Sequence, residues 1–341
     1  MKLTTENPID SVLPICDPHH HLWAHTTSTF VAAVGDHYLV EEFLQGTAGG
    51  HNIVQTVFVE CGQMYHKSGP QEMQPVGETE FVQDTTAQSA SGKYGMTTVA
   101  AGIVGFADLT LGAAVAPVLE AHISAGRGRF RGIRHKCTWD ANPDIKSDSK
   151  VKVLTLDPKF REGFAYLQKF GLSFDAWQYY TQLMDLVDLA RAFPYTAIIV
   201  NHVGGPLGIG PYAGKHDEVF QEWKRGMIAL ATCSNVIVKL GGLGVPTCGF
   251  GWDKRAKPPS STELANAMAP YYNLCIEQFG VDRCMFESNF PVDMISYSYT
   301  VLWNAFKRIT EYYSPEERAA LFRDTAVRVY RLASGHEGAI E

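Results

Sequence analysis

The feature that most constrains the fold of this chain is a repeated alternation of short apolar runs and longer stretches with helical periodicity. The apolar runs lie at residues 14–16, 53–59, 98–104, 130–135, 172–174, 197–200, 236–240 and 284–286. Their β-branched residues favour strands, whereas the stretches between them place apolar residues at i, i+3, i+4 and i+7. Strands that alternate with helices form a parallel sheet, and eight such units close into a barrel. The sequence therefore predicts an α/β fold, namely a (β/α)8 TIM barrel.

No repeat, low-complexity tract or long linker interrupts this alternation, so we expect residues 1–341 to form a single barrel domain. A last helix is predicted over residues 314–332. Ser314 is a favourable N-cap for it, Pro315 fits the first turn and Glu317 completes a capping box. An open doubly wound sheet is the competing architecture. It is disfavoured because no glycine-rich phosphate loop follows the first apolar run.

Charge and cysteine content narrow the class of partners and the compartment. With 29 Lys+Arg and 36 Asp+Glu, the formal net charge is −7, which argues against a nucleic-acid or membrane partner because either needs a basic face. The 7 cysteines are scattered and form no C-x-x-C pair, as is usual in a reducing compartment. The sequence shows neither a signal-peptide pattern nor an apolar run of membrane-spanning length. We therefore expect a cytoplasmic protein that acts on a small-molecule substrate, with outer helices that could support a homodimer.

The densest group of candidate site residues follows the first apolar run. Within the segment Asp17–Trp23, His19 and His21 are two residues apart, and alternate side chains of a strand share a face. Both can therefore point into the barrel at the carboxyl end of a strand, with His20 pointing away. Two converging imidazoles can hold a divalent metal or polarise a substrate. The alternative is a histidine cluster satisfied by backbone groups and water.

Three more strand ends carry polar candidates. His202 follows the sixth run, and the glycines after it allow close approach of the backbone, although a lone histidine there could be structural. Glu287 and Asn289 share a face after the eighth run, and Asp293 lies in the loop beyond. Their carboxylates could be metal ligands or general bases, or Asp293 could cap the following helix. Glu60, after the second run, is either a site carboxylate or a capped loop residue.

The fourth, fifth and seventh runs add candidates for substrate binding. An arginine on a barrel strand must find an anion, so Arg134 could clamp a substrate carboxylate or form an internal salt bridge with Asp175. Lys239, at the end of the seventh run, is a weaker candidate for binding an anion for the same reason. The substrate-binding candidates are therefore Arg131, Arg134, His135 and Asp175.

Together these motifs resemble a known enzyme superfamily. The H-x-H of the first strand, N-H-x-G-x-P at 201–206 and S-N-F-P-V at 288–292 look like the amidohydrolase superfamily. More narrowly, they resemble its amidohydrolase-related branch, which includes lactonases for sugar lactones, pyrone dicarboxylates and muconolactones. Segments 130–135 and 173–175 are similar to the sugar-lactonase pattern. The resemblance implies a (β/α)8 barrel that hydrolyses a cyclic ester or amide at its C-terminal mouth.

Residue by residue, the resemblance implies that His19 and His21 are a metal-binding pair and that His202 ligates or polarises. Two departures stand out. The family's eighth-strand aspartate, the usual proton acceptor for the attacking water, falls on Asn289, which cannot take a proton at neutral pH. The fifth-strand histidine of the metal-dependent members is replaced, with Asp175 the nearest candidate. A binuclear site is therefore not expected, and one divalent metal, zinc or manganese, and the metal-independent mode of some lactonases both remain open.

These observations support three hypotheses. The first is a hydrolase that opens a lactone, or a related cyclic ester or amide, of a small carboxylated or aromatic molecule. In it, His19, His21 and His202 polarise the carbonyl or the water. A nearby carboxylate, Glu287 or Asp293 ahead of Glu60 or Asp175, takes the proton. The second is a metal-dependent non-oxidative decarboxylase on the same barrel, and the third is a non-catalytic barrel that has lost its base.

Overall fold

The computed structural model describes residues 6–25, 34–87 and 97–333, and it confirms the predicted barrel. Parallel strands follow one another around a single sheet in sequence order. Beyond the last strand, the backbone N–H of Asn289 donates to His19 (2.9 Å) and that of His21 donates to Phe290 (2.8 Å), which closes the barrel between its two ends. The strands are β1 (Pro14–His20), β2 (Asn52–Val59), β3 (Thr98–Gly105), β4 (Phe130–Ile133), β5 (Ser173–Ala176), β6 (Ile198–Val200), β7 (Val236–Leu240) and β8 (Cys284–Phe286).

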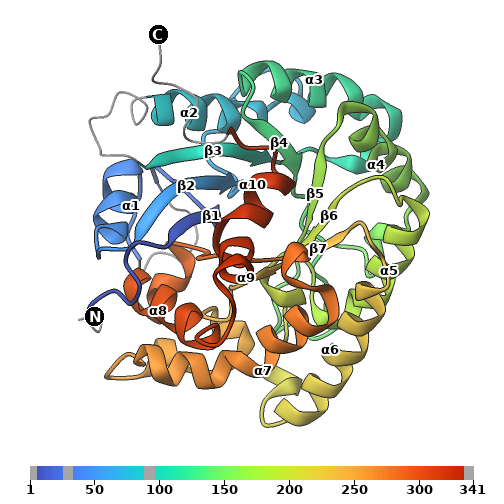
Figure 1. Cartoon of the computed structure of the whole chain (residues 1–341). Helices are drawn as coiled ribbons and strands as arrows, with labels where there is room; N and C mark the ends of the chain where they lie inside the picture. The colour runs from blue at the N-terminus through green and yellow to red at the C-terminus, as the bar shows by residue number, and fades with distance from the viewer. Residues whose placement is uncertain (1–5, 26–33, 88–96, 334–341) are drawn as a thin grey trace.

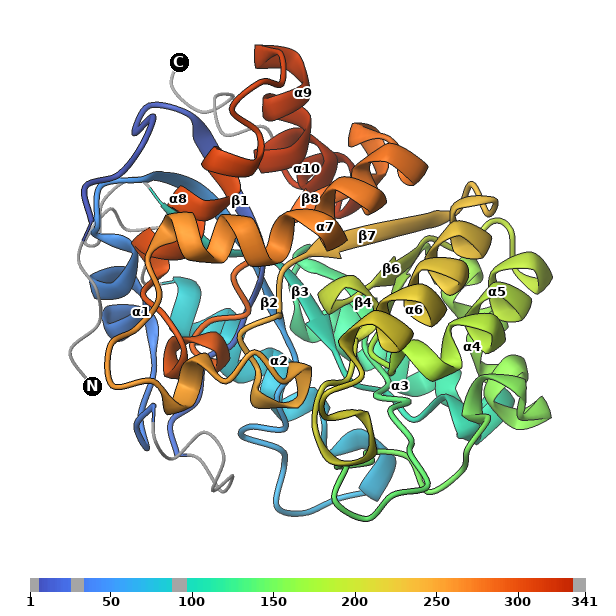
Figure 2. The same ribbon diagram turned by 90° about the horizontal axis from the view of Figure 1, so that it is seen from below.

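Helices form an outer layer around these strands (Figures 1 and 2). Each strand is followed by one of them, as a (β/α)8 barrel requires. In chain order they are α1 (Val40–Thr47), α2 (Val76–Ala87), α3 (Ala116–Ala125), α4 (Pro158–Phe170), α5 (Leu183–Ala192), α6 (His216–Ala231), α7 (Ser261–Phe279) and α8 (Tyr299–Ile309). Two short helices, α9 (Pro315–Ala319) and α10 (Thr325–Val329), end the described chain.

The start and packing of α4 show how local sequence places these helices. The side chain of Asp157 accepts hydrogen bonds from the backbone N–H groups of Lys159 and Phe160, which otherwise have no partner within the helix. The apolar side of the helix then packs on the barrel, and the Phe164 ring meets that of Phe174 on β5 at 5.1 Å. The same apolar periodicity that predicted this helix therefore also fixes the face that it buries.

The barrel interior is filled by alternate strand residues and is closed at one end by α10. Figure 1 shows α10 in front of the centre of the barrel. Near the strand starts, the Gln55 amide donates to the backbone oxygen of Ala333 (2.7 Å). The interior cluster comprises Cys16, Val57, Val59, Val104, Ile199, Ile237 and Met285, together with Ala326, Val329, Tyr330 and Leu332. The carboxyl ends of the strands, at the opposite end of the barrel, are therefore left for an active site.

Boundaries differ from the sequence prediction in two places. Strand β4 ends at Ile133, so Arg134 and His135 lie just beyond it. The predicted last helix starts as expected, with reciprocal capping bonds between Ser314 and Glu317, but a π-helical turn at Ala320–Asp324 separates α9 from α10. All seven cysteines lie in the described residues and are free. Among the described helices, none is both long enough and apolar enough to cross a membrane.

Candidate active site

Strand β1 separates its three histidines as the two-residue period predicts. His20 points out of the barrel, where its Nε2 lies 2.8 Å from Thr56 Oγ1 and its ring stacks on Phe43 at 4.5 Å. Burial lowers the pKa of His20 to about 3, so this ring is neutral. His19 and His21 lie on the inner side with ring centres 5.0 Å apart. The outward histidine is therefore structural, and the inner two belong to the site.

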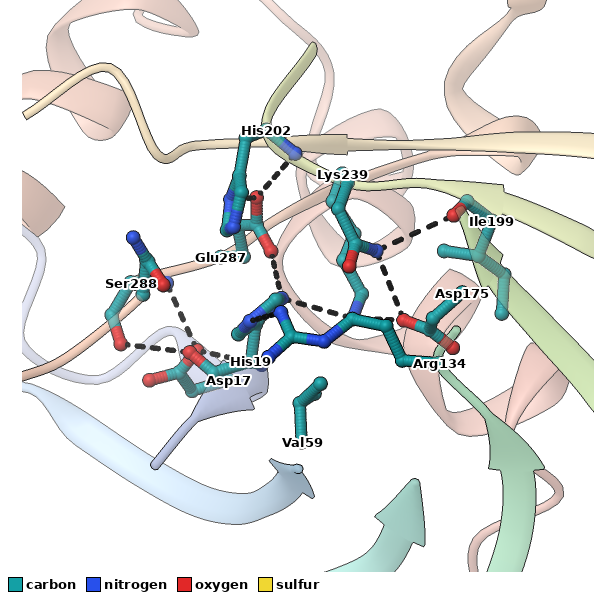
Figure 3. A network of polar contacts seen from close by, with 12 residues as sticks. Asp17, His19, Val59, Arg134, Asp175, Ile199, His202, Lys239, Glu287 and Ser288 are labelled. Atoms are coloured by element: carbon teal, nitrogen blue, oxygen red, sulfur yellow. Dashed lines mark hydrogen bonds and ion pairs between the residues drawn. The ribbon is translucent and has the colours of Figure 1, made fainter. Parts of the chain in front are cut away.

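Glu287 joins two strand ends by lying between two histidines (Figure 3). Its Oε1 lies 2.7 Å from His202 Nδ1 and accepts a second hydrogen bond from the backbone N–H of His202 at 2.9 Å. Its Oε2 lies 2.7 Å from His19 Nδ1. All three side chains are nearly or fully inaccessible to solvent. One carboxylate thus contacts two imidazoles that come from opposite halves of the sequence, and it is hydrogen-bonded to that of His202.

The backbone around this triplet is held in uncommon conformations. His202 has a φ of +53° and Asn289 a φ of +55°, both in the left-handed region that side chains other than glycine rarely adopt. Gly242 follows β7 with a φ of +70°, and a Cβ atom there would lie 2.2 Å from His202 Nδ1. At Gly241, a Cβ atom would lie 2.4 Å from Glu287 Cγ. The two glycines therefore make the room in which the histidine and the carboxylate meet.

Two cations flank the His19 ring. Lys239 Nζ lies 3.3 Å from its Nδ1, and Arg134 Nη1 lies 3.3 Å from its Nε2. Burial, reinforced by the charge of Lys239, holds the pKa of His19 well below its usual range. Lys239 also donates to Asp175 (2.7 Å), which accepts a further hydrogen bond from the Tyr330 hydroxyl (2.9 Å). The carboxylate of Asp175 therefore links Lys239, beneath the site, to Tyr330 at the end of α10.

Arg134 is fully engaged with its neighbours. Its Nε donates to Glu60 Oε1 (2.7 Å), and its Nη2 donates to the backbone oxygen of Glu60. The internal salt bridge that the sequence allowed is thus formed with Glu60 rather than with Asp175. Charges on Lys136 and Arg134 keep the pKa of Glu60 below its usual value despite its burial. Lys136 shares the same carboxylate oxygen at 3.3 Å.

His21 belongs to a second branch of the network. Its Nδ1 donates to the backbone oxygen of Val59 (2.7 Å), so its Nε2 carries a lone pair that faces Asn289 Oδ1 at 3.3 Å. The Asn289 amide in turn donates to Asp293 Oδ1 (2.8 Å), and the Tyr297 hydroxyl donates to Asp293 Oδ2 (2.5 Å). Burial raises the pKa of Asp293 to about 6. This branch holds Asn289 in place through Asp293, and it brings two acceptor atoms, His21 Nε2 and Asn289 Oδ1, to within 3.3 Å of each other.

Two predicted substrate-binding residues lie away from this cluster. Arg131 sits beside the end of the chain's last helix, where its backbone oxygen accepts from Arg331. His135 packs between the rings of Phe106 (5.2 Å) and Phe160 (5.5 Å), outside the barrel wall. The structure therefore brings together the other predicted residues, namely Glu60, Arg134, Asp175, Glu287, Asn289, Asp293, His19, His21 and His202.

Among the described residues, His19, His202 and Glu287 form a possible site for one divalent metal. Their ligand atoms lie within 4.8 Å of one another, and two histidines with a glutamate are a common zinc ligand set. The surrounding charges oppose it, because each ring nitrogen of His19 already has a cation 3.3 Å away. A divalent ion bound there would meet a lysine or an arginine at close range. The donor types fit a metal but their surroundings do not, so no step below depends on one.

Comparisons with known proteins agree with the barrel fold. A family model described as "Amidohydrolase" matches residues 16–332. The chain belongs to the amidohydrolase family. Within this family it is a hydrolase, since its relatives include an L-fucono-1,5-lactonase from Burkholderia multivorans, 26% identical over 68% of this chain and 72% of that protein.

Two other proteins cover nearly all of this amidohydrolase. An uncharacterized protein from Sinorhizobium fredii is 34% identical over 94% of this chain and all of its own length. A crystal structure of an amidohydrolase from Burkholderia multivorans with bound zinc has a TM-score of 0.72 at 23% identity, covering 94% of this chain and 99% of that chain. This structural likeness shows the shared fold.

Sequence reasoning overlooked several residues of the site. Lys136 lies two residues after Arg134, so the period that places Arg134 inward also predicts Lys136 at the mouth. Trp177 is not among the predicted site residues, yet its ring lies 4.8 Å from that of His202. Lys239 was a weak candidate and contacts His19 directly. No local signal in the sequence marks Gly241 and Gly242, because their role depends on side chains from other strands.

Proposed function

We propose that this amidohydrolase opens a lactone by adding water, and that His202 is the general base. The observation that carries the proposal is the pairing of His202 with Glu287. Since a carboxylate only accepts, the 2.7 Å contact places a proton on Nδ1 and leaves the lone pair of His202 on Nε2. A second hydrogen bond, from the backbone N–H of His202, fixes the carboxylate against that ring. This is the orientation of base by carboxylate that nucleophile activation requires.

In the proposed reaction, His202 Nε2 removes a proton from a water molecule as its oxygen attacks the lactone carbonyl carbon. The tetrahedral intermediate then breaks the bond between that carbon and the ring oxygen. The imidazolium returns the proton to the departing ring oxygen, so the products are a hydroxy acid and the unchanged base. Trp177 is half-buried beside His202, and the proposal places the entry of water and substrate on this side of the base.

Charge around His19 favours the transition state. Lys239 and Arg134 place two positive charges within 3.3 Å of a ring that burial keeps neutral. Negative charge that develops on the carbonyl oxygen near this ring is stabilised by them, in a buried setting where such interactions are strong. Asp293, whose oxygens accept from Asn289, Tyr297 and Gly244, acts as a support for the neighbouring turn.

The proposal is tested by acid release from a panel of lactones that includes L-fucono-1,5-lactone, related sugar lactones and lactones with a free carboxylate. Glu287→Gln and His202→Asn should each lower kcat/KM about 1,000-fold, since they remove the base or its orientation. The control is Glu277→Gln on the exposed face of α7, which should leave the rate unchanged. Treatment with a chelator should also leave it unchanged.

Three results would overturn the proposal. Wild-type rates in the Glu287 and His202 variants would remove the base. Loss of activity with chelator, restored by zinc or manganese, would show that a metal performs the step. Release of carbon dioxide in place of net acid from an unsaturated carboxylic acid would support a decarboxylase.

A further inference from the structure

The buried groups of the site leave one question of recognition, namely which of them binds the substrate away from the reacting carbonyl. Arg134 was the natural candidate for a carboxylate on the substrate. All three of its guanidinium nitrogens are already in contact with Glu60 or His19, and its side chain is 5% exposed. Lys239 is completely buried beneath His19. Neither cation can reach a substrate group without breaking contacts that hold the site together.

Lys136 differs from Arg134 and Lys239 both in its exposure and in its contacts. It lies two residues beyond Arg134, on the same side of the chain as it leaves β4. Its side chain is 31% exposed, whereas that of Glu60, its partner, is 3% exposed. The ammonium group reaches Glu60 Oε1 at 3.3 Å, an oxygen that Arg134 holds more closely at 2.7 Å. Lys136 therefore combines contact with a buried carboxylate and a side chain that is partly exposed to solvent.

Charge balance leaves this corner of the mouth positive. Glu60 is the carboxylate in contact with both Arg134 and Lys136, so two cations share one anion. The other buried carboxylate nearby, Glu78, accepts from the backbone N–H groups of Cys61 and Gln63. Burial and the charge of Glu60 raise its pKa to about 7, which reduces its negative charge at neutral pH. A surplus positive charge at an open face is a recognition site for an anion.

Trp177 is a neighbour of both Lys136 and His202, the proposed general base. Lys136 and Trp177 are paired in an isolated parallel β-bridge between neighbouring segments of the chain. The backbone N–H of Cys137 donates to the backbone oxygen of Trp177 at 2.9 Å. The indole meets the His202 ring edge to face at 4.8 Å. A cation, a flat apolar wall and the base therefore follow one another along the mouth, over neighbouring strand ends.

We infer that Lys136 binds a carboxylate carried by the substrate, and that the lactone ring lies against Trp177 with its carbonyl near His202. The inference rests on the proposed function and narrows it to lactones with an anionic substituent. Bound in this way, the substrate carboxylate neutralises the charge of Lys136, which Glu60 neutralises only in part because it also pairs with Arg134. Its carbonyl carbon then faces the lone pair of His202.

The test compares two lactones with the same ring, one with a free carboxylate and one with its methyl ester. In Lys136→Met, KM for the carboxylated lactone should rise at least 10-fold, while kcat/KM for the ester stays within about 2-fold of wild type. Lys136→Arg should restore most of the affinity, since it keeps the charge. The control is Lys146→Met, whose side chain is 79% exposed and pairs with Asp148 instead.

Three outcomes would overturn the inference. If Lys136→Met slowed both lactones equally, its role would be to position Glu60 and Arg134. If the wild-type enzyme preferred the ester, the mouth would not select an anion. Binding separates this inference from the proposed function. Calorimetry with tetrahydropyran-2-carboxylate, which cannot be hydrolysed, should show binding to wild type and at least 10-fold weaker binding to Lys136→Met. This difference would stand even if neither lactone were opened, and its absence would refute the carboxylate site.

Discussion

Gly242 shows how a single hydrogen atom in place of a side chain sets the position of the base. Its φ of +70° and the 2.2 Å distance from a built Cβ to His202 Nδ1 leave no room for alanine. Gly242→Ala should push the His202 ring off Glu287 and lower kcat/KM about 100-fold, because displacements of about 1 Å have effects of that size. The measurement is the rate of lactone hydrolysis by folded protein.

The matched control is Gly251→Ala. Gly251 has nearly the same φ, +68°, but a Cβ atom there has nothing within 4 Å. Both variants carry the backbone strain of a left-handed alanine, about 1 kcal/mol. Only the clash with His202 differs between them. Equal activity losses in the two variants would show that strain alone is responsible and that Gly242 does not place the base.

The histidines of β1 show what the sequence could and could not predict about the site. The two-residue period predicted that His19 and His21 point inward and that His20 points outward, and the structure agrees. It could not predict that Glu287 lies against His19 while Asn289 lies against His21. Residues two apart on a strand differ by about 6.6 Å along its axis. Which of them meets a given partner depends on the stagger of the barrel strands.

At the scale of elements, Asp293 ties together the loops that follow β7 and β8. Its carboxylate accepts from the backbone N–H of Gly244 in the first loop (3.0 Å), and from Asn289 and Tyr297 around the second. Burial raises its pKa from 3.8 to about 6, so the folded protein holds a proton that the unfolded chain releases between these values. The stability that this proton provides is complete below pH 3.8 and is lost as the pH rises through about 6.

This linkage predicts a difference in pH dependence. Between pH 5 and 7, the free energy of unfolding of wild type should fall by about 1 kcal/mol relative to Asp293→Asn, which has no proton to lose. Urea denaturation at pH 5, 6 and 7 measures both, with the exposed Asp144→Asn as control. Parallel pH profiles for wild type and Asp293→Asn would contradict the assignment of this pKa.

The type and order of the helices and strands were predicted better than the residues at which they end. The eight strands and the helices between them follow from periodicities that burial imposes on one face, so their type and order were visible in the sequence. The end of β4 at Ile133 was not, because pairing with neighbouring strands decides where a strand stops. The capping box of Ser314 and Glu317 was predicted since it is local. The π-helical turn of Ala320–Asp324 was not, because it lies where the helix packs on β1 and β8.

At the scale of the whole molecule, the closed end and the open end of the barrel are joined through Asp175. The Tyr330 hydroxyl, beside α10, donates to both of its oxygens (2.9 and 3.1 Å), and Lys239 links the same carboxylate to His19. Tyr330→Phe removes the hydroxyl but leaves Asp175 bonded to Lys239 and Asn201. Because the lost hydrogen bonds end on a buried charge, the free energy of unfolding should fall by about 2 kcal/mol.

The same change should leave catalysis nearly intact, with kcat/KM within about 2-fold of wild type, since the contact between Lys239 and Asp175 persists. Tyr312→Phe is the control, because Tyr312 is 94% exposed and loses nothing buried. Chemical denaturation and lactone hydrolysis measured on the same preparations separate the two effects. A large loss of activity with unchanged stability would mean that the closing helix acts on the chemistry through Asp175. The expected result places α10 among the elements that hold the barrel together, and it leaves the chemistry to the opposite mouth.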